Sequence, residues 1–223
     1  MTKPQVFVVA SQKGGSGKTA ICRLLSVHLS RQMHSVFLID LDIQKTLTKW
    51  HTKRTADEPK RIDLTIDALS TGLPLLANHG ADFVIIDTPP SDDEDENAHF
   101  VLTPAFASAD LIIIPIKPSP DDLESAGATV RRCKAFGVPF IFVVTQAISN
   151  TSITAQAIAA LSQHGVVSPA VLVNRVAYPS AFAVGKTPEE ISAGSSAAFE
   201  TGRLWESIQA HLATQNTKQE RKA

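Results

Sequence analysis

Cysteine is scarce in this 223-residue chain, which contains only Cys22 and Cys133. The two residues are far apart, form no CxxC motif and have no histidine at metal-ligand spacing. This scarcity argues against a disulfide framework and against a zinc site. We therefore expect a protein of a reducing compartment, with a cytoplasmic location.

Long apolar runs and an excess of one charge are also missing. No segment approaches the ~18 apolar residues of a membrane span, and no charged stretch precedes an apolar leader. We therefore expect no secretion and no membrane partner. The formal net charge is −1 and the pI is about 6.6, which excludes a uniformly basic surface. Affinity for nucleic acid must then come from a local patch or from self-association.

The chain does contain enough apolar material for one sizeable core, with 43% hydrophobic residues. A chain of this length should bury about 70% of its unfolded surface. We expect a single domain over residues 1–213. The polar residues 214–223 have the composition of a tail that frays.

Short apolar runs rich in β-branched residues alternate with longer segments of helical spacing. Such alternation predicts an α/β fold, a doubly wound, mostly parallel sheet with helices on both faces. Ligands of such sheets bind at the carboxyl ends of the strands. The expected strands are Val6–Ala10, Val36–Asp40, Phe83–Asp87, Leu111–Pro115, Phe140–Thr145 and Ala170–Val173, and one expected helix is Asp121–Phe136.

A glycine-rich loop, Gln12–Thr19, follows the first expected strand and precedes an amphipathic helix. This is the context of a phosphate-binding loop, or Walker A motif, in which backbone N–H groups face a β-phosphate. Lys18 would reach the β and γ oxygens, and the Thr19 hydroxyl would ligate Mg²⁺. The alternative is a glycine-rich turn with a chance Lys-Thr pair, but the flanking strand and helix favour the phosphate site.

The loop's KGGSGKT sequence, with the additional Lys13, resembles the deviant Walker A box of the ParA/MinD family of ATPases. The resemblance implies a P-loop NTPase fold with ATP and Mg²⁺ as cofactors. It also implies a homodimer in which Lys13 contacts the nucleotide of the partner protomer. The implied nucleotide-binding loop residues are Gly14, Gly15, Ser16, Gly17, Lys18, Thr19 and Ala20.

Carboxylates stand at the ends of two expected strands. Asp40 and Asp42 are two residues apart, so both point to the same side of an extended chain. The family resemblance implies that Asp42 activates the attacking water, as a catalytic residue beside Lys13 and Lys18, while Asp40 supports the metal. Asp87 ends a Walker B pattern and would hold Mg²⁺ with Thr19. The alternative for Asp40 and Asp42 is that they cap the helix that follows.

Later segments carry the resemblance along most of the chain. It places the residues after the fifth and sixth strands around the adenine, with Asn174 and Arg175, or Thr145 and Gln146, near the base. The sequence departs from the family pattern in three places. Ile43 replaces the usual proline, Lys45 replaces a common glycine, and Asp92–Glu96 adds an acidic loop that is either solvated or a docking site for a basic partner.

A ParA-type function would follow from this resemblance: an ATP-bound dimer binds DNA without sequence preference, and a ParB-like or other adaptor stimulates slow hydrolysis and release. Such a protein, active in plasmid partition or chromosome segregation, associates with the nucleoid when ATP-bound. No helix-turn-helix segment is expected before Val6, so the DNA contacts should be to phosphates. The candidate basic residues are Arg131, Arg132, Lys134, Arg175, Lys186, Arg203, Lys218, Arg221 and Lys222.

Three other functions of the same superfamily remain open. A MinD-like membrane regulator should end in a basic amphipathic helix, but no apolar face follows Leu212. A metal-cluster protein should place ligating cysteines at the dimer interface, whereas Cys22 and Cys133 resemble packing residues. A small-molecule kinase or ligase, similar to dethiobiotin synthetase, would need a second substrate pocket.

Overall fold

The computed structural model describes residues 3–90, 102–149 and 151–220. Seven strands form one sheet in the order β3-β2-β4-β1-β5-β6-β7, and every pairing is parallel. This confirms the expected parallel α/β fold. The strands are β1 (Gln5–Val9), β2 (Val36–Asp40), β3 (Lys60–Arg61), β4 (Phe83–Asp87), β5 (Leu111–Ile116), β6 (Phe140–Val144) and β7 (Val166–Val167).

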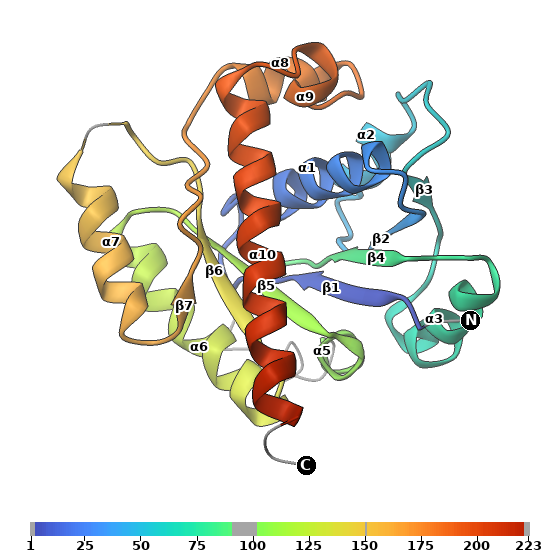
Figure 1. The fold of residues 1–223 in the computed structure, drawn as a ribbon, viewed down its shortest axis with the longest axis horizontal. Coiled ribbons are helices and arrows are strands. Elements are labelled where there is room, and N and C mark those ends of the chain that lie inside the picture. The colour runs from blue at the N-terminus through green and yellow to red at the C-terminus, as the bar shows by residue number, and fades with distance from the viewer. Residues whose placement is uncertain (1–2, 91–101, 150, 221–223) are drawn as a thin grey trace.

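Helices cover both faces of the sheet (Figure 1). One face packs against α3, α5, α6 and α7, and the other against α1, α2 and α10. The helices are α1 (Lys18–Arg31), α2 (Thr46–His51), α3 (Leu69–Asn78), α5 (Thr103–Ser108), α6 (Pro120–Phe136), α7 (Ser152–Ser162), α8 (Ala177–Ala183), α9 (Pro188–Ile191) and α10 (Ser196–Glu220), with a 3₁₀ turn at Ile66–Ala68.

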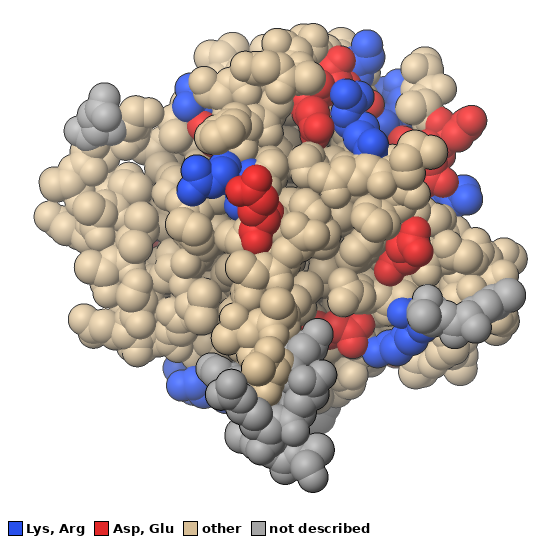
Figure 2. All heavy atoms as spheres, viewed as in Figure 1, with Lys and Arg blue, Asp and Glu red and all other residues tan. Residues whose placement is uncertain are grey.

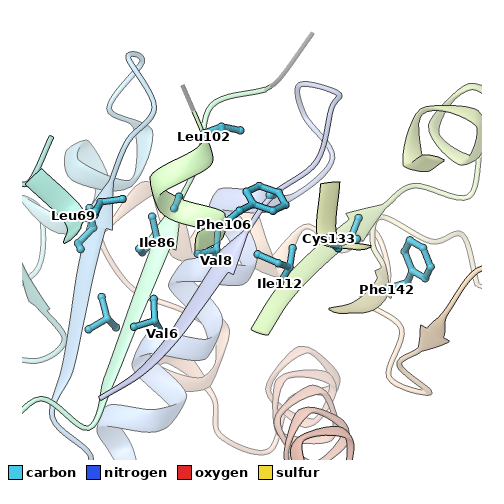
Figure 3. Packing of buried hydrophobic residues seen from close by; sticks show 14 of the residues in the cluster. Val6, Val8, Leu69, Ile86, Leu102, Phe106, Ile112, Cys133 and Phe142 are labelled. Atoms are coloured by element: carbon cyan, nitrogen blue, oxygen red, sulfur yellow. The ribbon is translucent and has the colours of Figure 1, made fainter. Parts of the chain in front are cut away.

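The alternation of side chains along β1 divides the core in two. Val6 and Val8 belong to the cluster under α3, α5 and α6, whereas Phe7 and Val9 belong to the cluster under α1 and α10. Figure 3 shows part of the first cluster, in which Val8 lies near Phe106 of α5. A strand with apolar residues on both faces is buried on both sides, as parallel sheets require.

Five of the six expected strands match the observed ones within one residue at each end, as does the helix expected at Asp121–Phe136; Val36–Asp40 and Phe83–Asp87 match at both ends. The strand expected at Ala170–Val173 is wrong. This segment makes only an isolated bridge, between Ala147 and Val173. The reason lies in β6, which ends at Val144, because Gln146 adopts a left-handed backbone (φ 51°) that interrupts further pairing.

Two features near the edges of the fold were not anticipated. The edge strands β3 and β7 have only two residues each, too few for a recognisable pattern. The domain boundary expected at residue 213 lies inside α10, which continues to Glu220. The acidic run Asp92–Glu96 lies outside the described residues. Within the described ranges, each helix is too short or too polar to cross a bilayer.

Candidate nucleotide-binding site

The loop between β1 and α1 wraps tightly because glycine occupies its last position. Gly17 has a left-handed backbone (φ 104°), which side chains adopt with strain. A Cβ at Gly17 would lie 3.3 Å from Cγ2 of Thr145. The Thr145 hydroxyl donates to the Ser16 carbonyl at 2.6 Å, and the Gln146 amide donates to the Gly15 carbonyl at 2.7 Å. The start of the β6–α7 connection therefore holds the loop's carbonyls, while α1 begins directly after it.

Lys18 lies inside this loop. Its ammonium group donates to the Lys13 carbonyl at 2.9 Å and lies 3.3 Å from both the carbonyl and the hydroxyl of Ser11. Burial lowers the pKa of Lys18, and the carboxylates of Asp87 and Asp42 oppose this shift. The loop thus holds a cation at its centre, where a polyphosphate would meet both the ammonium and the positive end of α1.

A cavity of about 390 Å³ opens above the loop. It brings together the glycine-rich loop, the start of α1 and the segment that follows β2. Asp42 lines this cavity, and its carboxylate accepts a hydrogen bond from the Gln44 N–H at 2.9 Å. The lining residues are Gly14, Gly15, Gly17, Lys18, Thr19, Ala20, Asp42, Gln44, Thr46, Pro90 and Gln146. The loop residues and the acid expected to act on water therefore share one space.

Thr19, which lines this cavity, is bonded to the buried Asp87. The Thr19 hydroxyl donates to Oδ2 of Asp87 at 2.6 Å, while Oδ1 of Asp87 is buried and has no partner within the described residues. Burial raises the pKa of Asp87 to about 7, with Asp40 adding to the shift and the Thr19 hydroxyl opposing it. An unpartnered buried carboxylate oxygen beside a hydroxyl fits a hard cation such as Mg²⁺.

No group of three His, Cys, Asp or Glu side chains within the described ranges is arranged to hold a metal ion. A protein-only metal cage is therefore absent from that part of the chain. This arrangement suits Mg²⁺, which usually takes one or two protein ligands and completes its shell with waters and substrate phosphates.

Asp40 makes the contacts of a helix cap. Its carboxylate accepts hydrogen bonds from the Thr48 N–H at 2.8 Å, the Thr48 hydroxyl at 2.9 Å and the Asp42 N–H at 3.1 Å. Both oxygens are thereby engaged with the segment around α2. The sequence left open a metal-supporting role or a capping role for Asp40, and these contacts are those of the cap. A role in metal binding stays a prediction.

Lys13 lies at the edge of a second, more open cleft of about 700 Å³ between the loop and α6. Its ammonium group is 3.8 Å from the carboxylate of Asp121, whose side chain is 85% exposed. An exposed pair at this distance is worth roughly 0–1 kcal/mol, so it does not fix Lys13 in place. The side chain is free to exchange Asp121 for a more highly charged partner.

A third cavity, of about 220 Å³, lies on the other side of Gly17 and Ala20. Asn174 and Arg175 line it together with Thr145 and Gln146, so the structure brings together all four residues proposed for the base. The guanidinium of Arg175 is held by Glu200, with nitrogen–oxygen distances of 2.7 and 2.8 Å. The other lining residues are Gly17, Ala20, Leu24, Leu172, Val173, Tyr178, Pro179 and Phe182.

Sequence reasoning did not identify the apolar part of this cavity. Leu24, Tyr178 and Phe182 come from α1 and α8, and no motif marks them. The only available signal was the general rule that purine bases bind in apolar, aromatic-lined pockets.

The basic residues considered for DNA differ in burial and in their partners. Arg132 is buried with its guanidinium over the ring of Phe106, so little of this candidate is accessible to DNA. Arg175 is paired with Glu200, and Arg203 lies 3.7 Å from Glu206. Lys134 and Lys186 are exposed, whereas Arg221 and Lys222 and the Lys218 side chain lie outside the described part. On the face shown in Figure 2, basic and acidic side chains are interspersed.

A parallel sheet with a glycine-rich loop between β1 and α1, and a buried acid at the end of β4, defines a P-loop nucleotide-binding domain. The chain belongs to the family described as the CobQ/CobB/MinD/ParA nucleotide binding domain, whose model matches residues 7–188. This confirms the family resemblance read from the loop.

Similar proteins include members of partition and positioning systems. The chain is 30% identical over 130 residues to maintenance of carboxysome distribution protein A of Halothiobacillus neapolitanus, covering 57% of each chain. It is 27% identical over 113 residues to protein ParA of Rhizobium radiobacter, covering 50% of this chain and 48% of that one. The chain thus spans about half the length of the relatives it matches in sequence.

Solved structures share the whole fold. A plasmid partition protein of Borrelia burgdorferi has a TM-score of 0.70 at 18% identity, covering 94% of this chain and 99% of that one. MinD of Pyrococcus horikoshii, complexed with Mg-ADP, has a TM-score of 0.72 at 16% identity, covering 92% of this chain and 96% of that one. At sequence identities this low, the similarity to these structures shows a shared fold and nothing more about function.

Proposed function

We propose that this chain is a ParA-type ATPase that positions DNA or another cargo by switching between an ATP-bound dimer and a released form. The observation that carries the proposal is the shared cavity of Lys18, Thr19 and Asp42, with Asp87 bonded to the Thr19 hydroxyl beneath it. The reaction would be ATP plus water to ADP plus phosphate.

Each residue has a role that its position allows. Lys18 and the loop N–H groups bind the β and γ phosphates, and the Asp42 carboxylate orients the attacking water and accepts its proton. Thr19 and Asp87 would hold Mg²⁺, which when bound neutralises charge on the phosphate oxygens. The apolar cavity lined by Asn174 and Arg175 would take the adenine.

Dimerisation would complete the site through Lys13. Its ammonium group lies in the open cleft, and within the described residues its ion-pair partner is the exposed carboxylate of Asp121. A polyphosphate on a facing protomer carries several negative charges, so it would attract Lys13 more strongly than Asp121 does. Closure of the dimer would then depend on ATP.

DNA binding would use phosphates and no base contacts. Because the surface of one protomer has mixed charge, a single protomer makes few phosphate contacts with DNA. Dimerisation doubles these contacts, so ATP binding would switch DNA affinity on. Three phosphate contacts per protomer become about six per dimer, and each adds about 0.9 to the salt slope. A ParB-like or other adaptor would accelerate slow hydrolysis, by on the order of 10³–10⁵ if it orders the site or supplies an arginine.

The relatives suggest the class of cargo. One is named for carboxysome distribution and others for plasmid partition. As part of the proposal, this chain would act in the cytoplasm and associate with the nucleoid when bound to ATP.

The test is binding to random-sequence duplex DNA with ATP, ADP or no nucleotide, at two salt concentrations. We expect salt-sensitive binding with ATP alone, and loss of that binding and of dimerisation in Lys13→Gln. Absence of DNA binding under all conditions, with phosphate transferred from ATP to a small molecule, would favour a kinase or ligase instead. Binding to anionic vesicles without DNA binding would favour a MinD-like regulator.

A further inference from the structure

Arg23 lies between the two cavities that would hold the two ends of a nucleotide. It is on α1, five residues after Lys18, and its side chain is buried. One guanidinium nitrogen, Nη2, donates to the Thr46 carbonyl at 2.9 Å. The same guanidinium lies 4.7 Å from the centre of the Phe182 ring. Phe182 lines the base cavity and Thr46 lines the phosphate cavity, so Arg23 touches a wall of each.

These contacts hold Arg23 in the absence of an ion pair. Among residues 3–90, 102–149 and 151–220, no carboxylate lies within ion-pair distance of its guanidinium, and Nε is buried without a partner. A guanidinium is planar, so its stacking on a ring and the direction of its hydrogen bonds change together. A shift of the Phe182 ring would therefore rotate the donor that holds Thr46.

A second connection joins the same two parts of the molecule. The indole N–H of Trp50, on α2, donates to the Lys186 carbonyl at 3.2 Å. Arg54 lies 4.8 Å from the Trp50 ring and donates to the Gly185 carbonyl at 2.9 Å. Arg23 also contacts this tryptophan, at 5.6 Å from the ring centre. Helix α2 is thus attached to the segment that carries Phe182.

The position of α2 determines the geometry beside the phosphates. Thr46 is the first residue of α2, and Asp40 binds the N–H and hydroxyl of Thr48 on the same helix. Asp42 lies between Asp40 and Thr46 in the chain, and its carbonyl accepts a hydrogen bond from the Lys45 N–H at 3.0 Å. Movement at Thr46 would therefore move the carboxylate that faces the water site.

We propose that Arg23 is a positioning residue that couples filling of the base cavity to the position of α2 and Asp42 beside the phosphate cavity. The inference rests on the proposed nucleotide-binding function. A base packed against Phe182 fixes the ring, the ring fixes the guanidinium, and the guanidinium fixes Thr46. Pyrophosphate has no base, so it would fill only the phosphate cavity. The Phe182 ring, and with it Arg23 and Thr46, would then not be held in position.

Trp50 provides the reporter for the test. The chain contains two tryptophans, so Trp205→Phe leaves Trp50 as the only one. In this background, Trp50 emission is measured with Mg-ADP and with Mg-pyrophosphate, ADP affinity by calorimetry, and the kcat of ATP hydrolysis in steady state. We expect a larger change in Trp50 emission with ADP than with pyrophosphate.

Two variants of Arg23 distinguish a positioning role from a merely structural role in the fold. Arg23→Met should abolish the ADP-specific emission change and lower kcat about tenfold, while the Kd for ADP changes less than about threefold. Arg23→Lys keeps the charge but loses the planar stack, so it should show the same loss. The matched control is Arg31→Met on the same helix, which removes a half-exposed guanidinium paired with Glu189 and should change none of these quantities.

Phe182→Leu probes the link from its other end. It should reduce the emission change as Arg23→Met does, and the double variant should be no worse than either single variant, because both act on one connection. An ADP-specific emission change that survives in both Arg23 variants would overturn the proposal, and so would additive losses in the double variant. Failure of the native protein, with both tryptophans, to bind ADP would instead overturn the proposed function.

Discussion

The hydroxyl of Thr19 donates to the carboxylate of Asp87 across 2.6 Å, which joins the first turn of α1 to the end of β4. The remaining oxygen of Asp87 is buried and has no partner in the part of the chain that the structure describes. A carboxylate in that state is poorly satisfied by the protein alone. This pair therefore links the stability of the domain to the cation that it would bind.

Removal of the Thr19 hydroxyl should affect both properties. Thr19→Ala removes the hydroxyl that donates to Asp87, which should lower the free energy of unfolding by about 1–3 kcal/mol without Mg²⁺. Mg²⁺-dependent ATP hydrolysis should fall about 100-fold. Thr19→Ser keeps the hydroxyl and serves as the control. Thermal unfolding and phosphate release measure the two effects, and equal hydrolysis by the Ala and Ser variants would contradict the assigned role.

The loop glycines differ in what they tolerate. Gly17→Ala should destabilise the fold by roughly 1–3 kcal/mol and prevent ADP binding, because its backbone is left-handed and a Cβ would crowd Thr145. Gly14→Ala is the matched control, since no heavy atom lies within 4 Å of the Cβ that it would add. Thermal unfolding of both variants checks the difference, and an unchanged midpoint for Gly17→Ala would show that the loop relaxes.

Glu200 organises the base cavity from α10. Its carboxylate accepts from the Tyr178 hydroxyl at 2.6 Å, from Arg175 and from the Val173 N–H at 3.2 Å. Glu200→Ala should raise the Kd for ADP about tenfold by releasing the cavity wall. Glu206→Ala, which removes an exposed carboxylate on the same helix, should leave the Kd unchanged. Calorimetry with ADP tests this, and equal affinities of the two variants would contradict the role of Glu200.

His51 should make the fold sensitive to acid. Burial lowers its pKa below 6.5, against an opposing hydrogen bond to the Pro59 carbonyl and with repulsion from Arg61 and Arg54. The folded state thus favours the neutral ring. Its contribution to stability is present above pH 6.5 and is lost as the pH falls through the lowered folded pKa.

His51→Gln should therefore lose less stability than the native protein when the pH is lowered from 7 to 5. Glutamine can still donate to the Pro59 carbonyl while carrying no titrating group. Urea unfolding at several pH values measures the difference. Parallel pH profiles for the two proteins would show that His51 does not titrate with unfolding.

The sequence by itself determined the fold class and the phosphate loop. Both depend on local patterns: apolar strands such as Phe83–Asp87, and glycines placed between a strand and a helix. Backbone N–H groups and the end of α1 form an anion site wherever this order of elements occurs. The roles of Lys18, Thr19 and Asp87 were therefore open to prediction.

Only the tertiary structure decided the base cavity, the cap at Asp40 and the burial of Arg132. Leu24, Tyr178 and Phe182 meet through packing of α1 against α8, and Ala170–Val173 fails to form a strand because of the backbone at Gln146. Arginine is usually a surface residue, but the guanidinium of Arg132 packs on the ring of Phe106. Such outcomes depend on contacts between segments far apart in the chain, which local propensity and spacing do not encode.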